Sequence, residues 1–310
     1  MACREGQTPM SAKTGKVRHG NHTAAAWLFL APAMTAIGVF FVVPVLSAFI
    51  LSLTDFDIYA LGDLSVVRFM GFHNYLRILE TPLFWTALKN TFYFVLVGGP
   101  LSVAASLGAA LMVNSKLARF KSFFRTVYFL PVVTSLVAVA VVWRYLYHPA
   151  HGLLNLFLSW FGVAPIDWLG NPAIAMPAII ILAVWKNFGY NMLIFIAGLQ
   201  NIPDDLYEAA HIDGAGSWRQ FVDITIPMLA PTTVFVVMIT IIGYFQLFAE
   251  PYVMTEGGPM NATTSIVLMM YEQGFRWWNM GFAAAVAFVL FAVILFFSIV
   301  QMIIQRRLQQ

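Results

Sequence analysis

The sequence predicts an all-α membrane protein with six transmembrane helices. Hydrophobic residues make up 60% of its 310 residues and charged residues only 10%, whereas a soluble domain carries about 25% charged residues. Six apolar runs are long enough to cross a hydrocarbon core of about 30 Å. They occupy residues 24–53, 90–113, 126–147, 173–199, 228–249 and 281–304. This composition excludes a disordered chain, a nucleic-acid-binding protein and a small secreted fold held by disulfides, since the chain has one cysteine, Cys3.

The first run, residues 24–53, follows a short basic tail, which is also how a secretory signal begins. The apolar part of a signal spans only about 7–15 residues and ends at a small-residue cleavage site. Here the run continues through Pro32 and Pro44 without such a site. We therefore expect a retained helix, tilted or kinked, preceded by a cytoplasmic tail over residues 1–23.

Basic residues predict the orientation, because cytoplasmic loops are enriched in Lys and Arg. An even number of spans places both termini on one side, together with loops 114–125 and 200–227, and residues 305–310 form a second cytoplasmic tail. Eleven of the seventeen basic residues then lie on that side. They are Arg4, Lys13, Lys16, Arg18, Lys116, Arg119, Lys121, Arg125, Arg219, Arg306 and Arg307. The outer loops are then 54–89, 148–172 and 250–280.

Aromatic residues in these outer loops are predicted to anchor the helices at the membrane interface, where Trp and Tyr are enriched. The residues concerned are Phe84, Trp85, Trp160, Trp168, Trp277 and Trp278.

The six runs contain no Asp, Glu or His, which ion-coupled transporters keep inside the membrane as relays. Glu250 only borders the fifth run. The chain also lacks a nucleotide-binding P-loop, G-x-x-x-x-G-K-[ST], and has no metal-ligand pair at helical spacing. We therefore expect neither catalysis nor a bound cofactor, and a partner must supply the energy for any uphill transport.

The loop over residues 200–227, called the acidic loop below, departs from the basic pattern of its side. Its acidic residues are Asp204, Asp205, Glu208, Asp213 and Asp223. The sequence predicts a first helix over 203–213, beginning at a proline and ended by Gly214, which favours the left-handed conformation that closes helices. Ser217-x-x-Gln220 predicts a capping box that starts a second helix, ending at Pro227 where the fifth span begins.

The acidic loop also carries a spaced motif. Glu208-Ala209-Ala210 is followed after three residues by Gly214, and nine residues later by Ile224-Thr225-Ile226-Pro227. This arrangement resembles the EAA signature loop of permease subunits of ATP-binding-cassette (ABC) importers, with Ile226 where leucine is usual. Three other segments are similar to the branch that imports sugars and glycerol phosphate. They are Phe69–Tyr75, Trp185-Lys186-Asn187 and Thr255–Pro259.

The resemblance implies a type I-like permease of the bacterial cytoplasmic membrane that forms half of a pathway for a mono-, di- or oligosaccharide. The implied partners are a second permease, two copies of an ATPase that binds ATP-Mg, and an extracytoplasmic solute-binding protein. The residues implied to couple to the ATPase are Glu208, Ala209, Ala210, Asp213, Gly214, Ile224 and Pro227. The same machinery importing glycerol phosphate or another polyol is one alternative, and a channel or an autonomous membrane enzyme is another.

Polar side chains in the fourth and fifth runs are candidates for lining a sugar pathway. These residues are Lys186, Asn187, Tyr190, Asn191, Tyr244 and Gln246. Amides and hydroxyls suit sugar hydroxyls, and aromatic faces suit the apolar side of a sugar ring. The alternative is that they only form hydrogen bonds between helices. For Lys186, whose charge is costly within a membrane, a helix break or a pairing with a second subunit are further alternatives.

Overall fold

The computed structural model describes residues 22–115 and 119–308 and divides into two compact units, residues 1–48 and 49–310. The first unit holds the start of one long apolar helix. This helix consists of α1 (His22–Ile37), a π turn η1 (Gly38–Val42) and α2 (Val43–Ser52), which ends in the second unit. Most of the predicted N-terminal tail, with Cys3 and its basic residues, lies outside the described residues, as do Lys116 and the last two residues.

The second unit is built from helices alone, apart from an isolated bridge between Thr54 and Phe69. It begins with two short 3-10 helices, η2 (Tyr59–Leu61) and η3 (Leu64–Val66), followed by α3 (His73–Glu80), α4 (Pro82–Tyr93), η4 (Phe94–Gly98) and α5 (Gly99–Asn114). Next come α6 (Lys121–Val133), α7 (Leu136–Leu146), α8 (Leu153–Ser159), α9 (Pro172–Gln200), α10 (Asp204–Ile212) and α11 (Ser217–Gln220). The last are η5 (Phe221–Thr225), α12 (Ile226–Phe245), α13 (Ala249–Met254), α14 (Ile266–Tyr271), η6 (Glu272–Arg276) and α15 (Met280–Leu308).

Five helices are long and apolar enough to cross a membrane: Ala26–Ser52, Pro82–Asn114, Pro172–Gln200, Ser217–Phe245 and Met280–Arg306. A sixth segment joins α6 and α7, which meet at a bend of 97°. The prediction of an all-α polytopic membrane protein is thus confirmed, and over the described ranges no strand forms.

The third apolar run, 126–147, differs from the single helix that its hydropathy predicts, because it breaks between α6 and α7. Pro131 lies in the last turn of α6, and it removes an amide donor from that turn. Thr134 is extended, and its hydroxyl donates to the Pro131 carbonyl at 2.6 Å. The local hydrogen bond closes the helix end and lets the chain turn.

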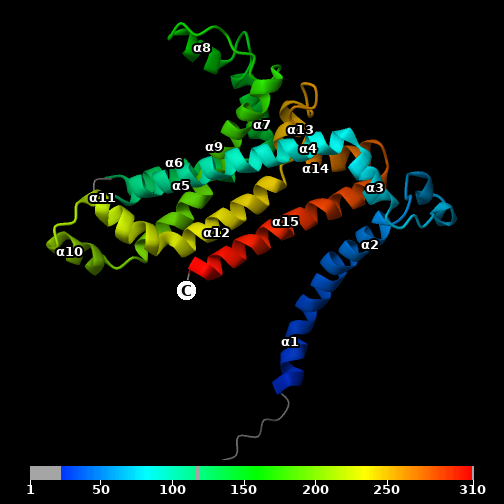
Figure 1. Ribbon diagram of the computed structural model, residues 1–310, viewed down its shortest axis with the longest axis horizontal. Coiled ribbons are helices and arrows are strands. Elements are labelled where there is room, and N and C mark those ends of the chain that lie inside the picture. Colours follow the sequence, from blue (N-terminus) through cyan, green and yellow to red (C-terminus); the bar gives the residue numbers. More distant parts are fainter. Residues whose placement is uncertain (1–21, 116–118, 309–310) are drawn as a thin grey trace, which may run out of the picture. The chain divides into compact units, whose positions relative to one another are not determined.

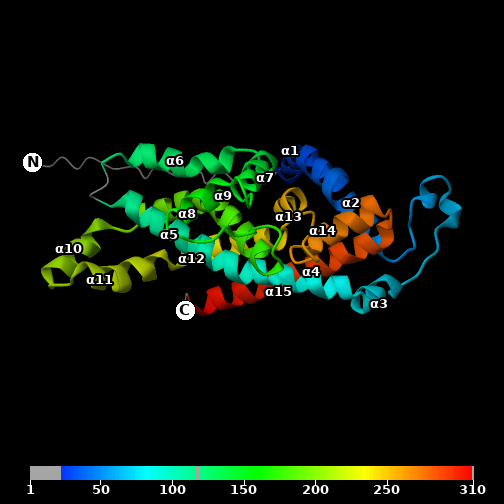
Figure 2. The same ribbon diagram turned by 90° about the horizontal axis from the view of Figure 1, so that it is seen from above.

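Helix α9 is central to the second unit. It packs against α5, α6 and α12, and these long helices run side by side in the ribbon (Figure 1). Figure 2 shows the same bundle from above, with the acidic loop at one end. A Cβ at Gly189 would collide with the Tyr128 backbone of α6, so this small residue lets two helices approach closely, as is usual between membrane helices.

Candidate functional site

Helix α10 of the acidic loop has the end that its sequence predicts. Gly214 takes φ +78°, which an L-residue other than Gly adopts at a cost. The Ala215 amide donates to the Ala210 carbonyl at 2.8 Å, and the Gly214 amide donates to His211 at 3.0 Å. These bonds satisfy carbonyls that the helix end leaves without partners. The prediction that Gly214 closes this helix is confirmed.

The second predicted helix of the loop differs from its prediction in two ways. The capping box does not form, because Gly216 occupies the N-cap and no side chain caps the helix. Ser217 is therefore the first helical residue, and Gln220 donates its side-chain amide to the Ala215 carbonyl at 3.1 Å.

The second helix also does not stop at Pro227. It passes through η5 into α12 as one apolar helix, Ser217–Phe245. A proline in an α-helix clashes with the carbonyl four residues earlier. Here the preceding turn is wider, since the Ile226 amide donates to the Phe221 carbonyl in a π pattern. Such a turn accommodates Pro227 without ending the helix.

Helix α10 is attached to η5, the turn that leads directly into α12. The hydroxyls of Tyr207 and Thr225 lie 2.9 Å apart and share a hydrogen bond. Tyr207 and Ile224 pack against a buried cluster that includes Leu229 of α12. The loop is therefore attached to a membrane helix by a hydrogen bond and by apolar packing.

The predicted coupling residues lie on the accessible part of this loop. Glu208, Ala209, Asp213, Gly214 and Pro227 are exposed, while Ala210 and Ile224 are half-buried. Ala210, Asp213 and Ile224 line a shallow cavity of about 250 Å³.

Two apolar side chains missed by the sequence reasoning stand beside the coupling residues. Ile212 is 86% exposed and Trp218 is 76% exposed. Large apolar residues within a polar loop were the available signal for them.

A cavity of about 520 Å³ lies between α9 and the end of α12. Five of the six predicted pathway residues line it: Asn187, Tyr190, Asn191, Tyr244 and Gln246. Ligand pockets have volumes of roughly 300–1,000 Å³, so this central cavity has the size to hold a small molecule.

The Asn191 and Tyr244 side chains at the central cavity differ in their hydrogen bonding. The Asn191 side-chain amide donates to the Thr240 hydroxyl at 2.9 Å. The Tyr244 hydroxyl is buried and has no hydrogen-bond partner among the described residues. A buried polar group without a partner is uncommon in folded proteins, and the side chains of Ser102 and Asn187 are the polar groups nearest to this hydroxyl.

Lys186, the sixth predicted residue, does not line the central cavity. Its side chain is buried, and its Nζ donates to the Val132 carbonyl at 3.1 Å. Val132 lies in the last turn of α6, where carbonyls have no amide partner further along the helix. Helix α9 is continuous at Lys186, so the helix-break alternative is wrong, and the bond to Val132 joins α9 to the end of α6.

Glu250 also lines the central cavity, although in the sequence it only borders the fifth apolar run. Helix α12 ends at Phe245, and α13 begins at Ala249, which brings the carboxyl to the cavity wall. Burial raises the pKa of the Glu250 carboxyl above its ordinary value. Hydropathy could not find this residue, because a reversal of the chain places it there.

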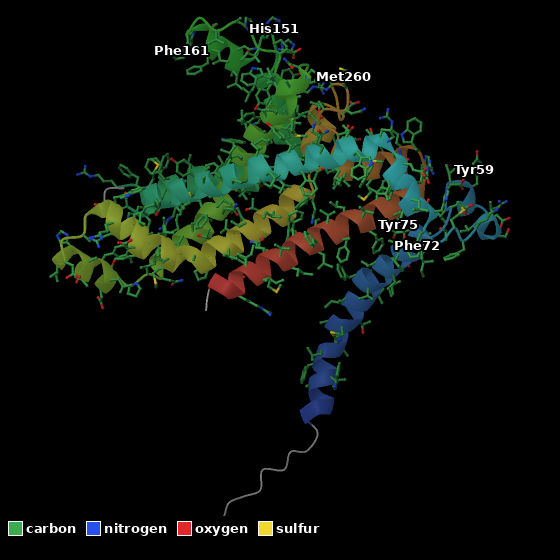
Figure 3. The ribbon with its side chains drawn as sticks, viewed as in Figure 1. Tyr59, Phe72, Tyr75, His151, Phe161 and Met260 are labelled. Atoms are coloured by element: carbon green, nitrogen blue, oxygen red, sulfur yellow. The ribbon has the colours of Figure 1, made fainter. Side chains whose placement is uncertain are left out.

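The aromatic residues of the expected outer loops fall into two groups. Phe84 is 2% exposed and packs in the main core, and the indole of Trp168 donates to Asn155 at 2.9 Å. For Phe84 the predicted role as an interfacial anchor is wrong, because it faces other helices. The exposed aromatics include Tyr59 and Phe161, which project from the second unit (Figure 3).

The sequence is similar to those of known transport proteins. The model of the family described as binding-protein-dependent transport system inner membrane component matches residues 102–310. The lactose transport system permease protein LacF of Rhizobium radiobacter is 39% identical over 280 residues, covering 89% of this chain and 92% of LacF. The trehalose/maltose transport system permease protein MalF of Thermococcus litoralis is 34% identical, covering 94% of this chain and 97% of MalF.

Solved structures share the fold. A chain of a bacterial alginate ABC transporter, in complex with an alginate pentasaccharide-bound periplasmic protein, superposes with a TM-score of 0.78. It is 22% identical, and the match covers 93% of this chain and 96% of that chain.

Proposed function

The chain belongs to the family of binding-protein-dependent transport system inner membrane components, and from this membership we propose that it forms half of the pathway by which an ATP-driven importer takes up a sugar. It is a multi-pass inner membrane permease subunit of an ABC importer and, like its relatives, not itself an enzyme. The sugar and the coupling to ATP are the proposed parts of this function.

The central cavity is the observation that carries the sugar assignment. Its lining includes two asparagines, a glutamine and two tyrosines from α9 and the end of α12, and these groups suit hydroxyls and the apolar face of a sugar ring. The relatives named for lactose and for trehalose/maltose support the same class of cargo.

The acidic loop supports coupling to a cytoplasmic ATPase. Its exposed EAA residues lie beside exposed Ile212 and Trp218, and a mixed polar and apolar surface of this kind suits a protein partner. Because Tyr207 and Thr225 fasten α10 to α12, a movement of the loop would be passed to a membrane helix. In this arrangement two ATPase copies bind ATP-Mg, a second permease completes the pathway, and a solute-binding protein delivers the sugar. Both termini and the acidic loop lie on the cytoplasmic side.

The cavity assignment is tested by uptake of a panel of radiolabelled sugars into proteoliposomes that hold the whole importer. We expect Asn187→Ala, Asn191→Ala and Gln246→Ala each to reduce transport of the cognate sugar about tenfold, the loss of one or two hydrogen bonds. The matched control is Asn201→Ala, since Asn201 is exposed beyond the end of α9. Unchanged transport in all three cavity variants would mean that these side chains only pack.

The coupling assignment is tested by two matched pairs. Gly214→Pro forces φ away from +78° and should uncouple ATP hydrolysis from transport. Gly216→Pro is its control, because Gly216 already has φ −68° and open space around it. Glu208→Lys should weaken substrate-stimulated ATP hydrolysis more than Asp205→Lys, another exposed acidic position of α10. Normal stimulation in both Gly214→Pro and Glu208→Lys would overturn the assignment.

A further inference from the structure

A second cavity, of about 510 Å³, lies in the segment between α12 and α15, outside the central cavity. Its lining residues come from α13, α14, η6 and the connection between α13 and α14. They are Tyr252, Val253, Glu256, Tyr271, Glu272, Phe275 and Arg276. We call this the upper cavity. None of these residues was a candidate from the sequence.

Aromatic rings form a continuous series through the upper cavity. Tyr252 and Tyr271 have ring centroids 5.2 Å apart, and Tyr271 and Phe275 are 5.5 Å apart. Phe248 lies 5.3 Å from Tyr252, nearly parallel to it, and 5.0 Å from Tyr271. Phe248 also lines the central cavity. The series therefore leads from one cavity to the other.

The series is open to a ligand at its far end. Tyr252 is 42% exposed and Phe275 is 60% exposed. Aromatic faces that remain accessible beside polar groups are suited to the C–H faces of a sugar ring, since each ring presents an apolar body.

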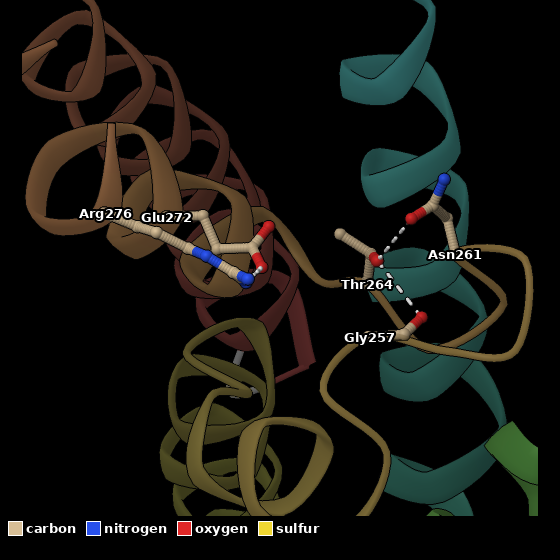
Figure 4. Close-up of polar contacts among 5 residues, drawn as sticks. All are labelled: Gly257, Asn261, Thr264, Glu272 and Arg276. Atoms are coloured by element: carbon tan, nitrogen blue, oxygen red, sulfur yellow. Dashed lines mark hydrogen bonds and ion pairs between the residues drawn. The ribbon is translucent and has the colours of Figure 1, made fainter. Parts of the chain in front are cut away.

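Charged groups border the rings. Arg276 and Glu272 form an ion pair at 3.4 Å (Figure 4), and Glu256 adds a second carboxylate to the lining. Two carboxylates and one guanidinium supply acceptors and donors for several hydroxyls. They also leave the upper cavity with one excess negative charge at neutral pH.

The wall that carries Glu256 is firmly held. Glu256 itself has φ +50°, an uncommon conformation for a residue other than glycine. The next residue, Gly257, accepts a hydrogen bond at its carbonyl from the Thr264 hydroxyl at 3.2 Å (Figure 4). Asn90 of α4 donates to the carbonyls of Asn261 and Thr264 at 2.8 and 3.0 Å. Side chains of the turn itself and of α4 thus hold the backbone around Glu256 in place.

We propose that the upper cavity is an entry site that binds a neutral saccharide, stacking it on Tyr252 and Phe275 and hydrogen-bonding it to Glu256, Glu272 and Arg276 before it passes Phe248 into the central cavity. This inference rests on the proposed sugar import. The excess negative charge repels a carboxylate or phosphate on the ligand, so a uronic acid binds more weakly than the matching neutral sugar. The sugar thus binds first at a site that favours neutral ligands over negatively charged ones.

The test measures protection of an engineered thiol in the whole importer. The chain has a single cysteine, Cys3, so Cys3→Ser gives a thiol-free background for Val253→Cys, a small change at a half-buried lining position. A methanethiosulfonate reagent labels this thiol, and mass spectrometry of the chain gives the rate. Lactose is the neutral probe, and galactose and galacturonate form a pair that differs only at one carbon. A ligand at about four times its dissociation constant should slow labelling about fivefold.

We expect lactose and galactose to protect Val253→Cys, and galacturonate to protect it less. Adding Tyr252→Ala should raise the sugar concentration that gives half-protection about threefold to tenfold, as the loss of one aromatic contact predicts. Adding Glu272→Gln should reduce the difference between the protection given by galactose and that given by galacturonate, because the substitution removes one negative charge. Tyr59→Cys, at an exposed tyrosine outside the upper cavity, is the control that sugar should not protect.

Uptake of lactose by the same reconstituted importer separates the two proposals. If lactose is transported while Val253→Cys is never protected, or is protected equally with Tyr252→Ala, the entry site is wrong and sugar import stands. If no sugar of the panel is transported or stimulates ATP hydrolysis, the proposed function fails and the entry site fails with it. Stronger protection by galacturonate than by galactose would overturn the charge argument.

Discussion

The acidic loop and the 255–265 turn both reverse the chain beside a long helix, but they are stabilised differently. In the acidic loop, Gly214 alone takes a positive φ, and a Cβ there would meet open space. In the 255–265 turn, Gly257 has φ +84° and a Cβ would lie 2.6 Å from the Thr264 hydroxyl. Three other residues, Glu256, Met260 and Asn261, also take positive φ.

The difference follows from what each reversal presents. The acidic loop needs only to turn, so that α10 offers its surface to a partner while Tyr207 fastens it from behind. The 255–265 turn forms the wall of a cavity, and its shape depends on hydrogen bonds from buried threonines and from Asn90. The acidic loop therefore depends on the backbone conformation of one residue, Gly214, whereas the 255–265 turn depends on a network of hydrogen bonds.

Alanine substitutions at Gly257 and Gly214 test this difference in stabilisation most directly. Gly257→Ala has to take a left-handed conformation, which costs about 1–2 kcal/mol, and it also displaces Thr264. We expect about 3 kcal/mol in total and an apparent Tm lowered by about 6–12 °C. Gly214→Ala bears only the conformational cost, with a fall of about 2–8 °C. Circular dichroism melts of the purified complex measure both, and equal falls would contradict the difference in packing.

The network is tested next through Asn90. Asn90→Asp keeps the shape of the side chain but removes both donated hydrogen bonds, an exposed one to Asn261 and a partly buried one to Thr264, which should cost about 1–3 kcal/mol. Hydrogen exchange of the amides over residues 257–265 should become faster, while exchange over residues 209–215 stays the same. Acceleration in both segments would mean that the two reversals are not independent.

The fastening of α10 is expected to give a smaller effect. Tyr207→Phe and Thr225→Val each remove one side of a single hydroxyl pair, and each should cost about 0.5–1.5 kcal/mol. The double variant should cost less than the sum of the two, because both substitutions break the same bond. Thermal unfolding supplies the four values of the cycle, and strict additivity would show that this bond does not contribute.

The smallest effect is expected at the surface ion pair of the acidic loop. Arg219 and Asp223 lie 3.2 Å apart, but their side chains are 77% and 59% exposed. Exposed pairs contribute only about 0–1 kcal/mol. Arg219→Ala should therefore leave the melting temperature and the salt dependence of stability nearly unchanged, and a fall of several degrees would show that the pair supports the loop.

The sequence predicts the parts of this protein that depend on local chemistry. The apolar runs predict membrane helices because the length and composition of one run are enough to identify a span. Gly214 predicts a helix end because the conformation of that single residue determines it. Most of the polar residues of α9 and α12 were also found, since a polar group within an apolar run stands out. Asn187 and Gln246 both line the central cavity, and their part in a sugar pathway stays a prediction.

The parts that were missed depend on how distant segments meet. The break in the run 126–147 is invisible to hydropathy, because residues on both sides of it are apolar. Pro227 suggests the start of a helix, and only the π turn before it shows why the helix continues. Glu250 and Tyr252 reach their cavities because α13 reverses the chain after Phe245, a turn with no strong local signal.

The π turn over Phe221–Thr225 has a consequence for the direction in which the acidic loop faces. A π turn contains one more residue than an α turn, but each completes one rotation about the helix axis. The extra residue is therefore absorbed without rotating Trp218 relative to α12, whereas one residue added to a plain α-helix would rotate it by about 100°. The π turn thus lets the helix contain one more residue while the acidic loop keeps its direction.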